Sequence, residues 1–407
     1  MRVYVIGGGP AGMMSAICAR RKGLPVTLLE KNDKTGKKLF ITGKGRCNLT
    51  NASSVQNIIE NTVRNGKFLY GAFHSFDSEK CMNFFEELGV PLKIERGNRV
   101  FPVSDKSSDV ISALNKEMRR IGVEVHLNER VVTFINGNNK ITGIITDHAT
   151  YQDVGYVILA TGGITYPTTG STGDGYLFAS NLGHTVIDPV PSLCDIRLKD
   201  VSTELQGVCL KNVVCSVKKD NKVLYSEFGE MLFTDKGVGG PIVLSLSARI
   251  CRLDTNGMTI SIDLKPALTE ETLDKRLLRD FEDNNNKSIK NVLAELMPKS
   301  LISTVLQQCG IQPSKSCNNI SKEERKNLIS AVKNLSFSVI GCEKERAVIT
   351  AGGIKVDQIV PRTMQSKLYD NLAFAGELID VDAMTGGYNL QIAFATGFVA
   401  GSNAEIK

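Results

Sequence analysis

The chain has 407 residues, which is more than one ordinary domain and predicts two or three units with sizeable cores. Hydrophobic residues make up 42% of the chain and charged residues 23%, a balance that excludes a disordered protein. The net charge of +6 is modest, and without a long basic run it argues against a nucleic-acid partner. No stretch approaches the roughly 18 apolar residues of a membrane span.

The N-terminal segment MRVYVIGGGPAG lacks the apolar core and the cleavage site of a signal peptide, so we expect a cytoplasmic location. The ten cysteines include no CxxC pair and no regular framework. We therefore expect reduced thiols, most of them small core residues. The sequence gives no indication of the oligomeric state.

The first predicted elements form a βαβ unit. Residues 2–6 have the apolar run of a buried strand, residues 11–22 the one-sided apolar pattern of a helix, and residues 26–30 a second strand. Downstream, similar patterns predict one helix and then three strands, over residues 105–120, 123–127, 131–135 and 141–146. The segment YVILATGG then predicts another buried strand that runs into glycines.

The pattern changes in the second half of the chain. From Leu193 to Leu264, short alternating segments predict an antiparallel barrel or sandwich, and the residues that follow are helix-like. The chain then returns to strand and glycine turn and ends in the apolar helix-like segment 388–400. The predicted fold class is α/β: a discontinuous Rossmann-like domain (1–192 and 342–407), an inserted antiparallel β-barrel-like domain (193–268 and 336–341) and a small helical domain (269–335).

Three spaced glycines follow the first predicted strand. In GGGPAG, Gly7, Gly9 and Gly12 have the G-x-G-x-x-G spacing between a strand and a helix. The first glycine permits a tight turn, the second lets a pyrophosphate approach the backbone, and the third lets the helix pack on the strand. The free N–H groups of the helix N-terminus would then face the phosphates.

Further motifs favour FAD as the dinucleotide. Glu30 ends the second strand, where a carboxylate can accept hydrogen bonds from a ribose hydroxyl. The chain has neither a second glycine fingerprint nor the redox CxxC of pyridine-nucleotide disulfide enzymes. Strands that end in ATGG (160–163) and in FAGELID (374–380) are typical of flavoproteins of this layout, and Glu377 is placed to reach the ribityl hydroxyls.

Two more glycine-rich segments bear on the flavin. Gly386 and Gly387 precede the apolar C-terminal helix, whose positive end could stabilise the negative charge that develops on a flavin during reduction. A plain buried helix explains the apolar run but not the paired glycines and Asn389. The segment TTGSTGDGYLFASNLG lacks the Lys-Ser/Thr pair of a P-loop. Its Thr172 and Asp174 either line the flavin or substrate or form a structural turn, and both interpretations stay open.

These motifs resemble a family of flavoproteins over essentially the full length of the chain. The family is described as aminoacetone-oxidase-like FAD-binding enzymes, NAD(P)/FAD-dependent oxidoreductases or bile-acid 4,6-reductase-type proteins. The resemblance depends on VIGGGPAG, GKKLFITGKGRCNLTN, RVFPVSDKSSDV, ATGGITYPTTGSTGDGY, LFTDKGVGGP, TAGGI and TMQSKLYDNLAFAGELIDVDAMTGGYNLQIAFATG. It implies an FAD domain with inserted barrel-like and helical domains. Asp235 departs from the histidine more usual in the family, which puts any acid–base role there in doubt.

The segment GKGRCNLTN (43–51) has three interpretations. A zinc site fails, because one cysteine without further ligands at suitable spacing cannot complete a tetrahedron, and no metal is expected. A catalytic thiol at Cys47 lacks a resolving partner, although Arg46 could lower its pKa. The resemblance instead implies the floor of a cofactor pocket, with Lys44 and Arg46 near anionic groups and Cys47 and Asn48 near the isoalloxazine.

The motifs and the resemblance together give the expected cofactor-binding residues. They are Gly7, Gly9, Pro10, Ala11, Gly12, Glu30, Lys31, Lys38, Gly45, Arg46, Cys47, Asn48, Val132, Thr161, Gly162, Gly376, Glu377, Asp380, Gly387, Asn389 and Leu390.

The leading functional hypothesis is an FAD-dependent reductase that takes a hydride from NAD(P)H and reduces an activated C=C bond of a small molecule. STGDGY also resembles the corresponding loop of fumarate reductases and ketosteroid dehydrogenases, which favours an enone of steroid or bile-acid type. The candidate catalytic donors are Arg46, Tyr166 and Tyr388. The alternatives are an amine oxidase of aminoacetone type that uses O₂, an FAD-dependent tRNA-modifying or RNA-binding protein, and a non-catalytic flavin-binding scaffold.

Overall fold

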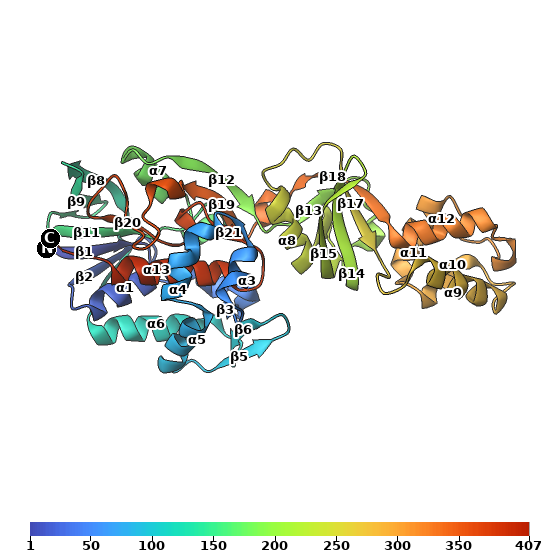
Figure 1. Cartoon of the computed structure of the whole chain (residues 1–407), viewed down its shortest axis with the longest axis horizontal. Helices are drawn as coiled ribbons and strands as arrows, with labels where there is room; N and C mark the ends of the chain where they lie inside the picture. Colours follow the sequence, from blue (N-terminus) through green and yellow to red (C-terminus); the bar gives the residue numbers. More distant parts are fainter. Residues whose placement is uncertain (407) are drawn as a thin grey trace. The chain divides into compact units, whose positions relative to one another are not determined.

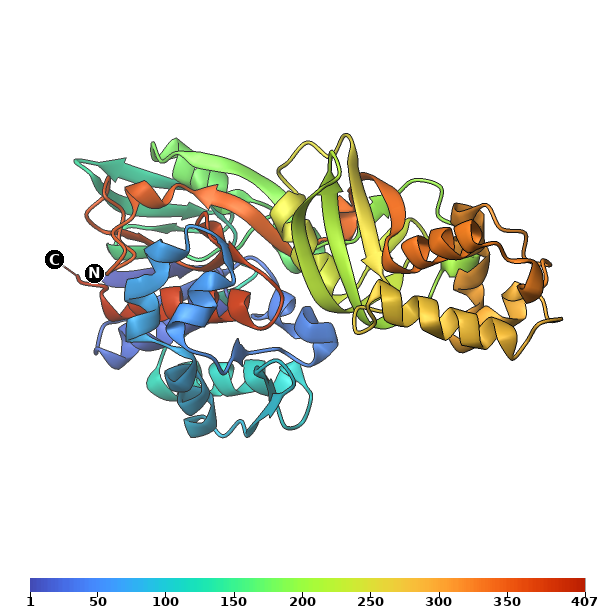
Figure 2. The same cartoon turned by 45° about the vertical axis from the view of Figure 1, so that its right-hand side comes forward.

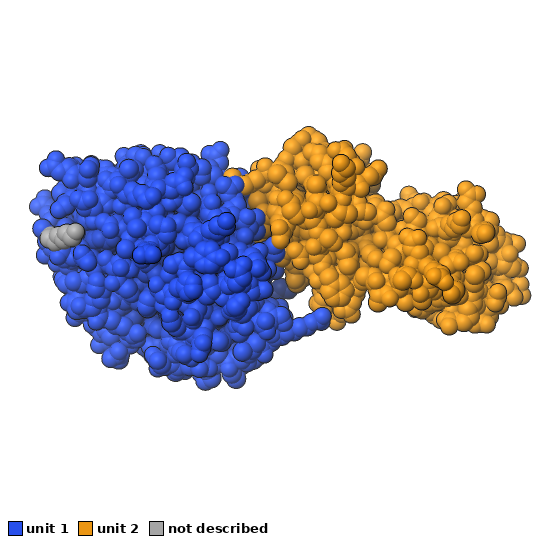
Figure 3. Space-filling model, viewed as in Figure 1, with its two compact units in different colours: residues 1–191, 348–407 blue, residues 192–347 orange. Residues whose placement is uncertain are grey.

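The computed structural model describes residues 1–406. The chain folds into two compact units (Figure 3). The first unit comprises residues 1–191 and 348–407, and the second comprises residues 192–347. The sequence placed residue 342 onward in the first domain. In the structure, strand β18 (Leu335–Cys342) runs through that position, and the Glu343 N–H donates to the Asp195 carbonyl at 2.8 Å. Residues 342–347 therefore belong to the second unit.

A five-stranded parallel sheet forms the centre of the first unit, with the strand order β20-β11-β1-β2-β7. Its strands are β1 (Arg2–Ile6), β2 (Val26–Glu30), β7 (Glu124–Leu127), β11 (Val154–Leu159) and β20 (Leu372–Phe374). β2 and β11 are buried throughout, and the apolar run of β11 predicted its burial. Because β20 comes from the C-terminal segment, the predicted discontinuous Rossmann-like domain is confirmed.

Two long helices pack closely beside this sheet. α1 (Pro10–Arg21) lies next to α13 (Tyr388–Ser402) in both views (Figures 1 and 2). A Cβ atom at Gly397 would lie 2.4 Å from the Ala11 carbonyl oxygen, and one at Gly401 would lie 2.3 Å from that of Ser15. The two glycines therefore let the helix backbones approach, and the Ser15 hydroxyl donates to the Gly397 carbonyl at 3.0 Å.

Smaller sheets and short helices complete the first unit. The sheets have the orders β3-β6-β5, β10-β9-β8, β12-β19 and β21-β4. The elements are α2 (Lys37–Ile41), β3 (Thr50–Asn51), α3 (Val55–Glu60), β4 (Thr62–Arg64), α4 (Tyr70–Ser75), α5 (Ser78–Glu87), β5 (Leu92–Glu95), β6 (Arg99–Pro102), α6 (Ser107–Ile121), β8 (Val131–Gly137), β9 (Lys140–Thr146), β10 (Thr150–Tyr151), α7 (Asp174–Asn181), β12 (Val186–Ser192), β19 (Ile349–Ile354) and β21 (Asp382–Ala383).

The second unit contains a closed antiparallel barrel with the strand order β13-β16-β15-β14-β17-β18. Its elements are β13 (Ile196–Leu198), β14 (Cys209–Lys219), β15 (Lys222–Phe233), β16 (Gly237–Gly239), α8 (Pro241–Ile250), β17 (Met258–Asp263), α9 (Glu270–Glu282), α10 (Ile289–Val292), α11 (Lys299–Cys309), α12 (Lys322–Lys333) and β18. One continuous apolar core joins the barrel to the helices. Helix α8 was not predicted, because PIVLSLSARI alternates like a strand; Pro241 at its first position is the start signal.

Within residues 1–406, no helix is long and apolar enough to cross a membrane.

Candidate functional site

The turn between β1 and α1 forms a glycine cradle, defined here as residues 7–12. A Cβ atom at Gly7, which has φ +105°, would lie 2.6 Å from the Ala160 carbonyl oxygen. One at Gly12 would lie 1.9 Å from the Gly7 carbonyl oxygen, whereas one at Gly9 would meet no atom of residues 1–406 within 4 Å. The outer two glycines thus serve close packing, and Gly9 leaves open space above the backbone.

The first turn of α1 presents unshared N–H groups beside this open space. Pro10 occupies the first helical position, no side chain within the described range caps the helix, and its first turn holds no acidic residue. The N-terminus of a helix attracts anions through its free N–H groups and its dipole. The cradle therefore fits the pyrophosphate of a dinucleotide.

Glu30 lies next to the cradle at the end of β2. One of its carboxylate oxygens accepts from the Gly8 N–H at 2.6 Å, and the other accepts from the Asn32 N–H at 2.9 Å and from its amide at 2.6 Å. The side chain is almost fully buried. A carboxylate has about four lone-pair positions, so Glu30 can still accept a hydrogen bond from a ribose hydroxyl.

Lys31 fastens the STGDGY segment to the end of β2. Its ammonium donates to the Asp174 carboxylate at 2.8 Å and to the Thr172 hydroxyl at 2.5 Å. The Asn32 amide also donates to the Thr169 carbonyl at 3.1 Å. Through these contacts the segment forms an ordered turn, and this turn lies beside the cradle. The contacts therefore support both interpretations of the segment, as a lining of the flavin or substrate and as a structural turn.

A second charged group joins four separate segments of the first unit. The Lys38 ammonium contacts the Glu377 carboxylate at 2.7 Å and the Thr165 hydroxyl at 2.9 Å. The other Glu377 oxygen accepts from the Thr350 N–H at 2.7 Å. Lys38 and Glu377, both predicted as cofactor-binding residues, thus contact each other. The structure adds Thr165 and Thr350 to this group of contacts, and no spacing in the sequence indicates either threonine.

Thr161 and Asp380 carry buried oxygen atoms that lack a hydrogen bond within residues 1–406. Thr161 lies in the predicted ATGG segment directly after β11, and Asp380 ends the FAGELID segment. The second Asp380 oxygen accepts from the Asn65 amide at 3.0 Å and lies 3.3 Å from the Arg64 guanidinium. Because buried polar atoms are nearly always satisfied, these two atoms fit a site that is completed by a polar ligand.

The GKGRCNLTN loop has a tightly wound backbone. Gly43, Lys44, Gly45 and Cys47 all have φ between +57° and +83°. In the orientation that satisfies both ends of its amide, Asn48 accepts from the Gly387 N–H at 2.9 Å and donates to the Thr50 and Val100 carbonyls. The loop therefore connects strands β3 and β6 with the start of α13. Lys44 is exposed.

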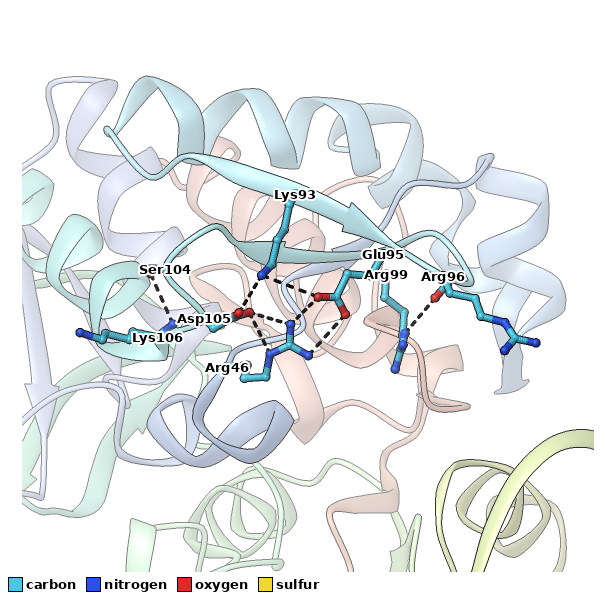
Figure 4. A network of polar contacts seen from close by, with 8 residues as sticks. All are labelled: Arg46, Lys93, Glu95, Arg96, Arg99, Ser104, Asp105 and Lys106. Carbon is cyan, nitrogen blue, oxygen red and sulfur yellow. Dashed lines mark hydrogen bonds and ion pairs between the residues drawn. The ribbon is translucent and has the colours of Figure 1, made fainter. Parts of the chain in front are cut away.

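Arg46 is held in a network of polar contacts, shown in Figure 4. Its guanidinium lies 2.5 Å from Glu95 and 2.6 Å from Asp105, and it stacks over the Phe101 ring at 4.1 Å from the centroid. Lys93 also contacts Asp105, at 2.7 Å. These contacts give Arg46 a part in positioning the loop against the β5–β6 hairpin; its part in catalysis stays a prediction.

Burial sets the chemistry of Cys47. The side chain has no exposed surface, and this burial raises the pKa of its thiol to about 12. The expectation that Arg46 could lower this pKa is wrong, because the guanidinium is engaged by Glu95 and Asp105. A thiol with so high a pKa holds almost no nucleophilic thiolate near neutral pH.

The start of α13 reaches the loop from the other side. A Cβ atom at Gly387, which has φ +99°, would lie 2.3 Å from the Thr50 carbonyl oxygen. The Asn389 amide brackets the Ala383 backbone, since its oxygen accepts from the N–H at 3.0 Å and its nitrogen donates to the carbonyl at 2.8 Å. Leu390 is half-buried against the core. These contacts hold the N-terminus of the helix firmly in place.

The two candidate tyrosines differ in their contacts. Tyr388 is buried, which raises the pKa of its hydroxyl, and that hydroxyl donates to the Asn57 amide oxygen at 3.4 Å. Tyr166 is half-buried, and its hydroxyl makes no hydrogen bond to any described residue. Its backbone has φ +55°, which is rare for a bulky side chain and often marks a functional position. Val132, the remaining predicted residue, is 53% exposed at the start of β8.

Most of these residues share one edge of the sheet. The cradle follows β1, Glu30 ends β2, Thr161 and Gly162 follow β11, and Gly376 and Glu377 follow β20. Since these strands are parallel, all four sets lie at their carboxyl ends, which is where α/β proteins of this architecture bind dinucleotides.

We expect the substitution Arg46→Gln to reduce the acid dependence of stability. Arg46 holds the pKa of Glu95 below its ordinary value of 4.5. Lys93 and, to a smaller extent, Arg46 hold the pKa of Asp105 below its ordinary value of 3.8. Such carboxylates stabilise the fold at pH above these ordinary values, and that contribution disappears as the pH falls through the lowered pKa values. Melting temperatures measured from about pH 7 down to about pH 3 should therefore fall less steeply in the variant.

The matched control is Arg96→Gln, because the Arg96 side chain points away from this network in Figure 4. It should retain the pH dependence of the unmodified protein. Equal slopes for all three proteins would show that the network contributes nothing measurable to stability.

Comparisons with known proteins agree with this geometry. The model of the HI0933-like protein Rossmann domain matches residues 1–403. The 3-dehydro-bile acid delta(4,6)-reductase of Clostridium scindens is 29% identical over 99% of this chain and 98% of its own. The ribosomal RNA dihydrouridine synthase of Escherichia coli is 29% identical over 97% and 95%. The solved 3-ketosteroid delta1-dehydrogenase from Sterolibacterium denitrificans is 12% identical with a TM-score of 0.52 over 98% of both chains, which bears on the fold alone.

The glycine cradle at the carboxyl edge of a parallel sheet defines a dinucleotide-binding protein, and with these relatives it places the chain among the FAD-dependent oxidoreductases. The chain belongs to the HI0933-like protein family, whose model matches almost its whole length. The family resemblance and the fold class drawn from the sequence are therefore confirmed.

Proposed function

We propose that the protein uses NAD(P)H to reduce a carbon–carbon double bond that is conjugated to a carbonyl group. The observation that carries this proposal is the full-length similarity to two relatives with different substrates. The delta(4,6) double bonds of a 3-dehydro bile acid and the bond that is saturated in dihydrouridine are all alkenes in conjugation with a carbonyl. The shared chemistry is thus the addition of two hydrogens to such a bond.

FAD would supply the hydride transfer in this reaction. The chain's own groups would bind and orient: the α1 N-terminus would hold the pyrophosphate, Glu30 a ribose hydroxyl, and Glu377 the ribityl hydroxyls. The α13 N-terminus, with its partial positive charge, would favour negative charge in its vicinity. The Tyr166 hydroxyl, free of protein partners within the described chain, would deliver a proton to the substrate.

We propose a steroid or bile-acid enone as the substrate, in a cytoplasmic enzyme that has access to NAD(P)H. The bile-acid reductase supports this choice because the alignment covers nearly the whole of both proteins.

Uridine in RNA is the second candidate substrate. The sequence argued against nucleic acid because it has no long basic run, and the structure pairs Lys38 with Glu377 and Arg120 with Glu117. The similarity to a ribosomal RNA dihydrouridine synthase nevertheless leaves the exclusion of nucleic acid unsupported.

Anaerobic stopped-flow absorbance tests the proposal. FAD-loaded protein is mixed with NADH or NADPH, and a 3-oxo-4-ene or 4,6-diene steroid is then added. We expect a nicotinamide to bleach the yellow flavin band and the steroid to restore it. If both nicotinamides leave the band intact while aminoacetone bleaches it, the protein is an amine oxidase instead. If neither donor bleaches it, the proposed electron source is wrong.

A parallel experiment replaces the steroid with unmodified ribosomal RNA. Recovery of the band together with a gain of two hydrogens at a uridine, measured by mass spectrometry of the digested RNA, would establish the second candidate. Recovery with the steroid alone would exclude it.

A further inference from the structure

A cavity of about 240 Å³ lies in the second unit, where the barrel meets the helical segment. Its floor is apolar and comes from β14, from the end of β17 and from the segment before α11. The floor residues used here are Leu210, Leu264, Leu296 and Met297, all of them buried. The wall also contains two lysines, Lys211 and Lys265. The cavity therefore combines apolar surface with positive charge.

Both lysines lack a counterion of their own. Neither ammonium makes a hydrogen bond or an ion pair to any residue between 1 and 406. Lys333, by contrast, is paired with Asp263 at 2.6 Å and donates to the Lys265 carbonyl at 3.0 Å. The Asp263 carboxylate, which also accepts from the Lys265 backbone N–H at 2.9 Å, is thus already paired with another lysine.

The surroundings of Lys265 penalise its charge. Burial and, to a smaller extent, the Arg276 guanidinium lower the pKa of its ammonium. Arg276 has its own partner in Asp280, at 3.4 Å. A half-buried cation without an anion is costly, and an anionic ligand would remove that cost.

The start of α11 adds to the positive character of the wall. Pro298 precedes the helix and lines the cavity, and within the described structure no side chain caps this helix and no acidic residue lies in its first turn. Its exposed N–H groups carry partial positive charge.

We propose that this cavity binds a small amphipathic anion, with its carboxylate between Lys211 and Lys265 and its aliphatic body against the apolar floor. The volume is below the roughly 300–1,000 Å³ of pockets for drug-sized ligands, so a short chain fits better than a long one. The residues of the cofactor site all belong to the first unit, and this inference goes beyond the proposed reaction.

Cys209 provides a reporter for the test. It lines the cavity and is exposed, whereas the other nine cysteines are buried or partly buried. We would titrate the full-length protein with octanoate by calorimetry and measure, by mass spectrometry, how octanoate changes the rate of Cys209 alkylation by iodoacetamide. Octanoate should bind and slow the alkylation, whereas octanol and octylammonium should do neither.

Substitutions then test the two charges. Lys265→Met and Lys211→Met keep the apolar stem, and each should weaken octanoate binding at least about tenfold. Lys275→Met is the control, because that lysine is exposed on α9 and pairs with Glu271. Attachment of a bulky maleimide to Cys209 should abolish binding without any substitution, so the result does not depend on the folding of a variant.

Three outcomes would overturn the proposal: octanoate leaves the Cys209 rate unchanged, octanol protects as well as octanoate, or Lys265→Met and Lys275→Met bind octanoate equally.

Discussion

Replacement of Gly9 by alanine is expected to weaken FAD binding at least about tenfold and to leave the melting temperature of the FAD-free protein unchanged. Gly9 has φ −78°, which alanine adopts without strain. A Cβ atom there meets nothing within 4 Å in residues 1–406, so it can collide only with a ligand. Titration with FAD, followed by flavin fluorescence, and melts of the FAD-free protein give the two readouts.

Gly12→Ala should behave differently. Its Cβ atom would lie 1.9 Å from the Gly7 carbonyl oxygen, so the turn itself must shift at a cost of about 1–3 kcal/mol. The melting temperature of the FAD-free protein should therefore fall. Gly137→Ala is the neutral control, because a Cβ atom at this position on β8 meets no described atom within 4 Å. FAD binding by Gly9→Ala at the unmodified affinity would mean that the cradle does not hold the pyrophosphate.

Local patterns explain what the sequence predicted well. The spacing of Gly7, Gly9 and Gly12 specifies a turn whose geometry is set within a few residues, and the buried strand β1 that precedes it has an apolar run. The barrel was anticipated for the same reason, since β17 alternates apolar and polar residues and β15 alternates more and less exposed ones along most of its length.

Long-range pairings explain what the sequence missed. The partners Lys38 and Glu377 lie 339 residues apart, and Arg46 meets Glu95 and Asp105 across 49 and 59 residues. No periodicity encodes such pairs, because they depend on how distant loops meet at the edge of the sheet. The motif identified Arg46 as important but could not show that its guanidinium forms ion pairs within the protein.

Tyr166→Phe is expected to slow the substrate-dependent recovery of the flavin band about 10²-fold and to leave its bleaching by NAD(P)H unchanged. Removal of the hydroxyl deletes the proposed proton donor and leaves the aromatic ring in place. Tyr166 directly follows Thr165, whose hydroxyl accepts from Lys38 at 2.9 Å, so it lies beside the Lys38–Glu377 pair. Its hydroxyl has no partner in residues 1–406 to compete with a substrate.

The matched control is Tyr70→Phe, because Tyr70 is an exposed tyrosine that donates to Gln56 and belongs to no part of the proposed site. Both half-reactions should keep their rates in this variant.

Tyr388→Phe decides between the two candidate donors. Tyr388 is buried and already bonded to Asn57, so a proton from it would first require that contact to break. If Tyr388→Phe slows the recovery of the band and Tyr166→Phe does not, the donor is on α13 and the strained backbone of Tyr166 has another cause. If either variant slows bleaching by the nicotinamide as strongly as recovery, its hydroxyl acts on the flavin site as a whole. A loss confined to recovery in Tyr166→Phe would assign the proton to Tyr166, because only the step that adds hydrogen to the substrate needs a donor.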